Sequence, residues 1–151
     1  MNQVSYPLLR AQAEALLSGQ RNRISNAANL AALIYQELPE VNWAGFYFKV
    51  GQVLMLGPFQ GKPACVEIPV GSGVCGTAAL SGEIQRVGDV HAFDGHIACD
   101  ADSESEVVVP LFKHGKLVGV LDVDSPRRDR FDADDERGLA MLAEVYLASI
   151  D

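Results

Sequence analysis

Three cysteines, Cys65, Cys75 and Cys99, are the residues of this 151-residue chain best suited to redox or nucleophilic chemistry. No two of them form a Cys-x-x-Cys pair, so a thioredoxin-type motif is absent. Their spacing also lacks the paired short-range ligands of ordinary zinc sites, which disfavours a metal site built from the cysteines and a loop histidine. The remaining alternatives are reactive thiols and small buried apolar residues.

The surroundings of the three thiols differ. Cys65 lies in an apolar segment, where burial as a small residue is as reasonable as reactivity. Cys75 follows a glycine-rich turn at the start of a predicted helix, where the positive helix end should lower the pKa of a thiol. Cys99 lies in a polar stretch, where a purely structural role is least expected. The sequence therefore favours Cys99 and Cys75 as reactive groups.

Acidic residues form a second candidate group. In the predicted strand 117–124, alternation places Asp122 and Asp124 on one face, and two acids in an apolar strand are costly unless they adjoin an open site. Glu106 lies in the preceding strand. A two-residue turn would place Glu106 opposite Val123, whereas a three-residue turn would place it opposite Asp124. Simple capping of strand ends in water is the alternative to a cluster.

If the three acids do cluster, at least one of their pKa values should rise, because three close carboxylates cannot all ionise cheaply. A carboxylic acid that stays protonated near neutral pH can donate a proton. The remaining negative charge can hold an ammonium group. Together with a thiol, these are the groups that reduction of an amino-acid sulfoxide requires.

Aromatic residues lie on both faces of the predicted strand 42–50. We expect Phe46 and Phe48 to face the core, and Trp43 and Tyr47 to line a small pocket, although a core position for Trp43 is equally compatible with the sequence. The glycine-rich turn at 71–76 offers backbone N–H groups that could bind a carboxylate.

The hydrophobic pattern predicts the elements that position these side chains. The order of two helices, a mostly antiparallel sheet and a last helix indicates an α+β fold, formed by one domain over residues 1–151. The polar loop predicted over residues 88–104 is long for a compact domain, which is typical of a functional segment. We predict helices at 7–17, 25–38 (with Ser25 as N-cap) and 132–150 (with Asp132 as N-cap), a short helix in GSGVCGTAALSG, strands at 42–50, 52–57, 64–69, 84–87, 105–112 and 117–124, and a loop at 88–104.

Composition narrows the classes of partner. The formal net charge of −8 disfavours contact with nucleic acid or an anionic membrane. The sequence shows neither an apolar run long enough to span a bilayer nor a secretory signal, so we expect a cytoplasmic protein with reduced cysteines.

The motifs NWAGFYF, LGPFQGKPAC, GVCGTAA, HAFDGHIACD, SEVVVPL and GVLDVDSP span nearly the whole chain. In these motifs and in its cysteine spacing, the chain resembles the free methionine-(R)-sulfoxide reductases, which are built on the GAF fold. This resemblance implies a GAF-like catalytic domain with a mostly antiparallel central sheet, flanked by N-terminal helices and a C-terminal helix. It also implies a homodimer that needs no cofactor or metal and is regenerated by thioredoxin.

The resemblance also implies roles for individual residues. The attacking cysteine would be Cys99 of HIACD, the recycling cysteine Cys65 of GKPAC, and Cys75 of GVCGTAA an auxiliary. Catalysis would pass through a cysteine sulfenic acid and an intramolecular disulfide. The residues that would bind substrate are Glu106, Asp122, Asp124 and Trp43, and to these we add Tyr47 from its strand position; Glu106 and Asp124 are also the candidate proton donors.

Two departures from the family pattern are visible. Asp94 stands where proline is expected in the loop, and the segment 100–106 is more acidic than expected, which disfavours a thiolate at Cys99. No residue with an implied role is missing. The alternative functions are a GAF module that senses a small ligand without reacting, which would leave the thiols unexplained, and a reductase of peptide-bound methionine sulfoxide.

Overall fold

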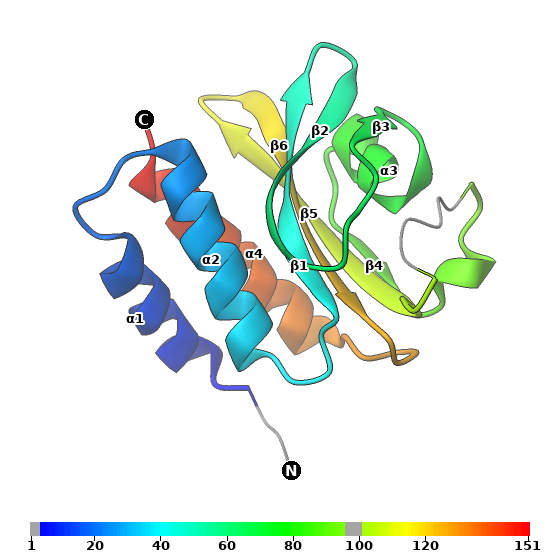
Figure 1. Ribbon diagram of the computed structural model, residues 1–151, viewed down its shortest axis with the longest axis horizontal. Coiled ribbons are helices and arrows are strands. Elements are labelled where there is room, and N and C mark those ends of the chain that lie inside the picture. The colour runs from blue at the N-terminus through cyan, green and yellow to red at the C-terminus, as the bar shows by residue number, and fades with distance from the viewer. Residues whose placement is uncertain (1–3, 96–100) are drawn as a thin grey trace.

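One antiparallel sheet of six strands organises the computed structural model, which describes residues 4–95 and 101–151. Its strand order is β3-β2-β1-β6-β5-β4, so the middle of the sheet joins strands from the two halves of the chain (Figure 1). The strands are β1 (Trp43–Val50), β2 (Val53–Gly61), β3 (Glu67–Pro69), β4 (Gln85–Val87), β5 (Ser105–Lys113) and β6 (Lys116–Ser125).

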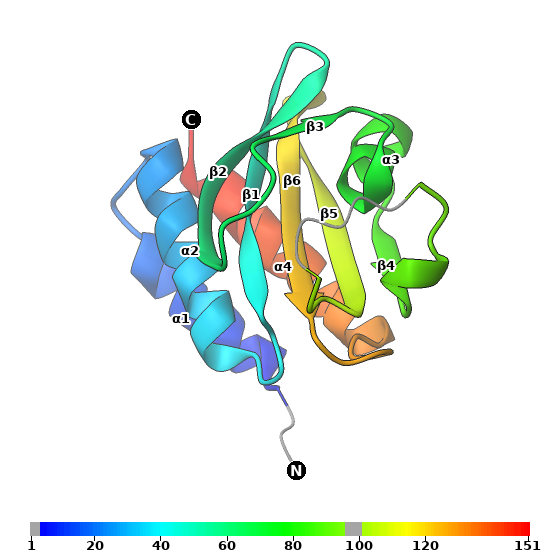
Figure 2. The same ribbon diagram turned by 45° about the vertical axis from the view of Figure 1, so that its right-hand side comes forward.

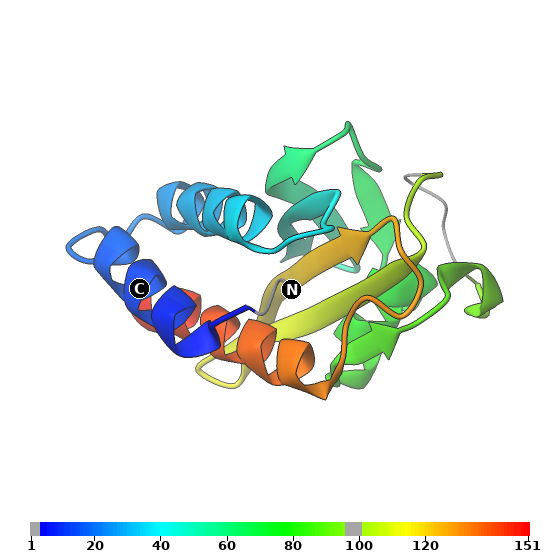
Figure 3. The same ribbon diagram turned by 90° about the horizontal axis from the view of Figure 1, so that it is seen from below.

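Helices cover the two faces of the sheet unequally. The N-terminal helices α1 (Tyr6–Leu17) and α2 (Arg23–Glu37) lie with α4 (Ala133–Ser149) on one face, and α3 (Gly73–Ser81) lies on the other (Figures 2 and 3). This arrangement confirms the predicted α+β fold. Among the described residues, no helix is both long enough and apolar enough to cross a bilayer.

Two hydrophobic clusters follow from this layering, because alternate side chains of a strand point to opposite faces. The larger cluster joins Phe46, Leu121 and Val123 of the sheet to α1, α2 and α4. The smaller one joins Trp43 and Tyr47 to α3. The strand β1 therefore divides its aromatic residues as predicted, with the phenylalanines in the main core.

The helix boundaries test the predicted caps. Asp132 caps α4, and its side chain and that of Asp135 exchange hydrogen bonds with each other's backbone N–H, which forms a capping box. The predicted cap of α2 was wrong: the helix begins after Asn22 rather than Ser25. The side-chain oxygen of Asn22 accepts hydrogen bonds from the N–H groups of Ile24 and Ser25, both at 2.9 Å.

The strands differ from prediction chiefly in the middle of the chain. β2 runs on to Gly61, well beyond its predicted end, while β3 is reduced to Glu67–Pro69. The polar loop contains a short 3₁₀ helix, η1 (Val90–Ala92), that the sequence pattern did not predict. Cys99 lies outside the described residues.

The hairpin of β5 and β6 combines the two registers that the sequence left open. Its turn has two residues, His114 and Gly115, both with positive φ, as tight hairpins require. The pairing then shifts by one residue at Val118, which is a β-bulge. Glu106 therefore lies opposite Asp124, as expected for a three-residue turn, although the turn itself is shorter.

The bulge also corrects the predicted face of one side chain. In the predicted strand 117–124, strict alternation would place Val118 on the face of Asp122 and Asp124. Instead, Val118 packs against the main core, and Leu117 packs on the side of α3. Beyond the bulge, alternation holds and both acids point toward α3.

Candidate active site

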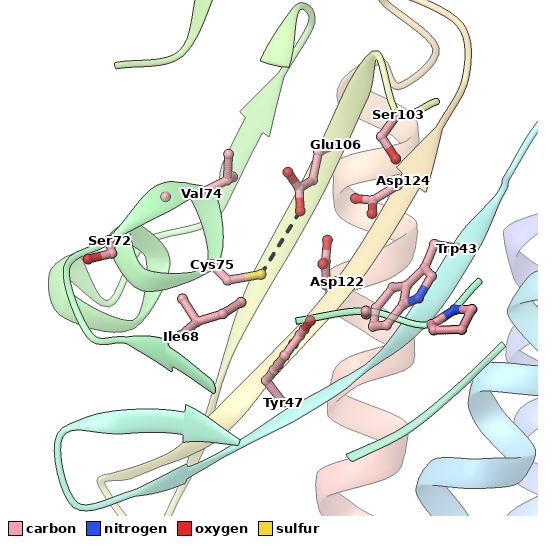
Figure 4. Close-up of a pocket in the computed structure, with 13 residues that line it drawn as sticks. Trp43, Tyr47, Ile68, Ser72, Val74, Cys75, Ser103, Glu106, Asp122 and Asp124 are labelled. Carbon is pink, nitrogen blue, oxygen red and sulfur yellow. Dashed lines mark hydrogen bonds between the residues drawn. The ribbon is translucent and has the colours of Figure 1, made fainter. Parts of the chain in front are cut away.

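A small cavity of about 40 Å³ lies between the sheet and the start of α3. Figure 4 shows Cys75, Glu106 and Asp122 pointing toward one another inside it. Strands β1, β5 and β6 supply one wall, α3 the opposite wall, and residues before β3 the rim. The lining residues are Trp43, Tyr47, Pro63, Ala64, Ile68, Ser72, Gly73, Val74, Cys75, Ser103, Glu106, Asp122 and Asp124.

The three predicted acids meet in this cavity. Glu106 lies opposite Asp124 across the β5–β6 ladder, and Asp122 is two residues along β6 on the same face. Their exposed fractions are 7%, 9% and 5%, so the alternative of strand-end acids in open water was wrong. The bulge is what brings them together, since without it this turn would place Glu106 opposite Val123.

Burial and mutual repulsion keep protons on this cluster. The pKa of Glu106 is raised well above its usual value by burial and then by the charge of Asp122. Burial followed by the charge of Asp124 does the same to Asp122. No lysine, arginine or histidine is among the described residues that line the cavity. The cluster is therefore ready to donate a proton or to accept a cation.

Cys75 is a free, buried cysteine at the start of α3, with its Sγ 4.0 Å from Oε2 of Glu106. The position at a helix start led us to expect a lowered thiol pKa, and that expectation was wrong. Burial raises the pKa of Cys75, and the charges of Asp122 and Glu106 raise it further. In this environment the thiol stays protonated unless a cation enters.

Of the other two cysteines, the structure describes only Cys65. The sulfur of Cys65 is disulfide-bonded, so it has no thiol to titrate. Cys65 lies just before β3, next to Ala64 of the cavity rim. Cys99, the residue to which the resemblance assigns the attack, falls outside the described residues.

Aromatic side chains from β1 form the wall beside the acids. The rings of Trp43 and Tyr47 stack at 5.8 Å between centroids, and Trp43 stacks on Phe59 at 5.2 Å. Nε1 of Trp43 donates to the carbonyl oxygen of Lys62, and the Tyr47 hydroxyl donates to that of Cys65, both at 3.1 Å. The wall therefore also holds the segment that carries Cys65.

The Tyr47 hydroxyl group keeps its proton, which allows it to donate the hydrogen bond to the Cys65 carbonyl oxygen. Burial, followed by the charge of Asp122, raises the pKa of Tyr47 above its usual value. A neutral phenol is a donor, which matches its hydrogen bond to a backbone carbonyl.

Several lining residues were not identified from the sequence. Ser103, with an exposed fraction of 6%, accepts a hydrogen bond from the Asn42 side chain at 3.3 Å and sits at the cavity edge. Nothing in the polar loop distinguished it from its neighbours. Ile68 also lines the cavity, and alternation within the predicted strand 64–69 could have assigned its face.

The same side chains could hold a metal ion. Cys75, Glu106 and Asp122 each offer a donor atom, and these three atoms lie within 4.8 Å of one another. The described residues thus allow two kinds of occupant at the acids, an organic ammonium group and a metal cation.

Comparison with known proteins identifies the family. Residues 13–148 match the GAF domain family. The free methionine-R-sulfoxide reductase of Escherichia coli is 50% identical over 149 residues, which cover 97% of this chain and 90% of the relative.

Two solved structures that were determined with substrate superpose over nearly the full chain. The fRMsr of Staphylococcus aureus has a TM-score of 0.95 and 46% identity, covering 100% of this chain and 99% of that one. The free methionine-R-sulfoxide reductase of Neisseria meningitidis has a TM-score of 0.92 and 38% identity, covering 99% and 95%. With the matching fold and a conserved length, the chain belongs to the free methionine-(R)-sulfoxide reductases, a family of GAF-domain oxidoreductases that act on sulfur.

Proposed function

We propose that this protein reduces free L-methionine (R)-sulfoxide to L-methionine with cysteine thiols as the source of electrons. One observation carries the proposal: three buried acids surround a cavity that no described basic side chain lines. Such a cluster requires protons or a cation, and a free amino acid brings an ammonium group. Relatives that bear the name of this activity, two of them solved with substrate, support the assignment.

The cavity suggests how a free amino acid would lie. Its ammonium group would be held by Asp122 and Asp124, the two acids that β6 places on the cavity side of the sheet. Its carboxylate would face the first turn of α3, because the side chain of Ser72 does not cap that helix and Gly73 and Val74 line the cavity. A peptide would lack one or both charges, which distinguishes this proposal from a peptide-methionine sulfoxide reductase.

The chemistry begins with attack of the Cys99 thiolate on the sulfoxide sulfur. Glu106 or Asp124 supplies the proton that the sulfoxide oxygen takes up, and burial favours the protonated form of Glu106. Methionine leaves, and the oxygen stays on Cys99 as a sulfenic acid. The substrate sulfur is thereby reduced by two electrons and the cysteine sulfur is oxidised by two.

Recycling then uses the second cysteine. The Cys65 thiol attacks the sulfenic acid, so that a disulfide between Cys65 and Cys99 forms and water is released. Thioredoxin would reduce this disulfide by exchange, and Cys75 would serve as an auxiliary thiol. The disulfide-bonded state of Cys65 supports its redox role. We place the cycle in a homodimer in the reducing cytoplasm.

A chiral amino-acid assay tests this proposal. The protein is incubated with free R,S-methionine sulfoxide and dithiothreitol, beside the N-acetylated substrate, and with a Cys99→Ser variant as the control. We expect loss of the free R epimer alone, and no loss in the variant.

Two results would contradict the proposal. Equal turnover of the N-acetylated compound would contradict the proposal that the acids bind the ammonium group of the substrate. A folded protein that consumes neither epimer would favour the non-catalytic GAF sensor instead.

A further inference from the structure

We propose that Cys75, Glu106 and Asp122 form a binding site for a thiophilic divalent cation such as Zn²⁺, at the floor of the cavity between α3 and the sheet. The ion would share Asp122 with the substrate ammonium group, so the two would compete, and this shared position rests on the proposed function. The site differs from the three-cysteine zinc site that the sequence disfavoured, because two of its three ligands are carboxylates on neighbouring strands.

The distances between donor atoms favour such an ion. In a tetrahedral zinc site with Zn–S about 2.3 Å and Zn–O about 2.1 Å, neighbouring donors lie about 3.5 Å apart. Here Sγ of Cys75 and Oε2 of Glu106 are 4.0 Å apart, and all three donors lie within 4.8 Å. Small side-chain rotations about χ angles would therefore bring them to bonding distance of one ion.

An unsatisfied oxygen gives an independent reason to expect a ligand here. Oδ1 of Asp122 is buried and makes no hydrogen bond with any residue that the structure describes, and the Asp122 side chain points into the cavity (Figure 4). A buried carboxylate oxygen without a donor is costly, and a cation would remove that cost. The three ligand residues are 5%, 7% and 5% exposed, in the order Cys75, Glu106 and Asp122.

The charge and the chemistry of the donor set favour zinc over a hard cation. A thiolate is a soft ligand that selects zinc-like metals, whereas magnesium and calcium prefer oxygen ligands alone. Asp124 and Tyr47 also face the cluster, and neither carries positive charge. Three protein ligands leave a fourth position toward the cavity, which a water molecule would fill, as in open zinc sites.

Binding balances as a proton exchange without any change of oxidation state. Zn²⁺ displaces the proton of the Cys75 thiol and that of whichever carboxyl group is protonated, and these protons pass to solvent. The metal–sulfur and metal–oxygen bonds replace the S–H and O–H bonds. Because the ion occupies the acids, it would inhibit the reductase reversibly rather than serve the reaction.

Cobalt(II) titration tests the site without relying on activity. The reduced Cys65→Ser/Cys99→Ser double variant keeps Cys75 as its sole thiol, so a thiolate-to-cobalt charge-transfer band in the near ultraviolet would report on this residue alone. We expect the band to appear, to saturate at one ion per chain, and to disappear when Zn²⁺ is added. Adding Cys75→Ser to this background should abolish it.

Carboxylate variants in the same background keep the proposal falsifiable if Cys75→Ser does not fold. Asp122→Asn should weaken Zn²⁺ binding by about tenfold or more, since even the loss of an outer-shell partner costs that much. Glu67→Gln, on the exposed outer side of β3, is the matched control and should bind as the parent does. Circular dichroism confirms the fold of each variant.

Several results would contradict the proposed metal site. A folded double variant without the charge-transfer band, a band that survives Cys75→Ser, or equal weakening by Asp122→Asn and Glu67→Gln would each refute the site. If the chiral assay is positive and yet saturating methionine sulfoxide leaves the Zn²⁺ affinity of the double variant unchanged, the shared position is wrong. A negative chiral assay would refute the proposed function and leave the cobalt result standing by itself.

Discussion

Replacing Asp122 with asparagine should make the protein more stable and less active at the same time. Asp122 is 5% exposed, and its Oδ1 has no hydrogen-bond partner among the described residues. Ionisation of such a group in the folded state is opposed by burial and by Asp124, which raise its pKa. An amide of the same shape carries no charge. Each unit by which burial raises the folded-state pKa contributes about 1.4 kcal/mol, so we expect a gain of about 1–2 kcal/mol at neutral pH.

The gain should depend on pH in a defined direction. Below the unfolded-state pKa of an aspartate, near 3.9, both states hold the proton and Asp122 does not affect stability. As pH rises from there toward the higher folded-state pKa, the unfolded chain releases its proton first, so wild-type stability falls. For a single group the slope in that window is about 1.4 kcal/mol per pH unit. Asp122→Asn removes the contribution of this group, so the two proteins should converge at acidic pH.

Urea denaturation of the reduced proteins at pH 4 and pH 7.5 would measure this difference, with Glu67→Gln as the control for loss of an exposed charge. For a chain of this size, each kcal/mol of added stability should raise the melting temperature by about 2–4 °C. Over the same substitution, kcat/KM for free methionine sulfoxide should fall about 30-fold, the effect of losing about 2 kcal/mol of a buried charge pair.

Two results would refute this reasoning. If Asp122→Asn is less stable than wild type at pH 7.5, the buried carboxylate is satisfied in the folded protein. If the stability difference is the same at both pH values, its origin is packing rather than ionisation.

Three further predictions concern single side chains. Cys65→Ser should release about one methionine per enzyme in a single turnover and then stall with thioredoxin as reductant, because the thiol that forms the disulfide with Cys99 is gone; sustained thioredoxin-driven release of methionine would contradict its role. Tyr47→Phe removes the hydrogen bond to the Cys65 carbonyl, so rapid-quench measurements should show slower disulfide formation with a smaller change in the first-turnover rate; equal slowing of both would indicate a general packing effect. Asp132→Ala should cost about 1 kcal/mol in urea denaturation by removing the N-cap of α4, with kcat/KM unchanged. Its hydrogen bond from the Asp135 backbone lowers the Asp132 pKa, so the difference should shrink as pH falls through that pKa; a constant difference would argue against the capping box.

Local patterns were enough to predict much of the fold. The alternation in β1 separated Phe46 from Trp43 and Tyr47, because the residue period of a strand assigns faces without reference to other elements. The cap at Asp132 was also a local property, since its partner Asp135 is three residues away. The cap of α2 was wrong because Asn22 and Ser25 are both good cap residues, and the choice between them depends on where the chain enters the helix.

The site depended on features that no local pattern contains. The raised pKa of Cys75 comes from burial against β5 and β6, which outweighs the helix-end effect expected from its sequence position. The bulge at Val118 has one sequence signal that we did not use, the glycine that follows it. A Cβ atom on Gly119 would lie 2.1 Å from the Tyr47 carbonyl oxygen, so only glycine lets β1 and β6 approach there.

The bulge in β6 makes the active site sensitive to the length of the hairpin tip and tolerant of its composition. Glu106 faces Asp124 whether the extra residue lies in the turn or at Val118, because both arrangements contain the same number of residues. Substitutions in the exposed turn at His114 and Gly115 should therefore leave Glu106 opposite Asp124. A one-residue insertion or deletion that the tip does not absorb would turn both acids of β6 into the main core. Natural variation in this hairpin should accordingly conserve its residue count more strictly than its residue types.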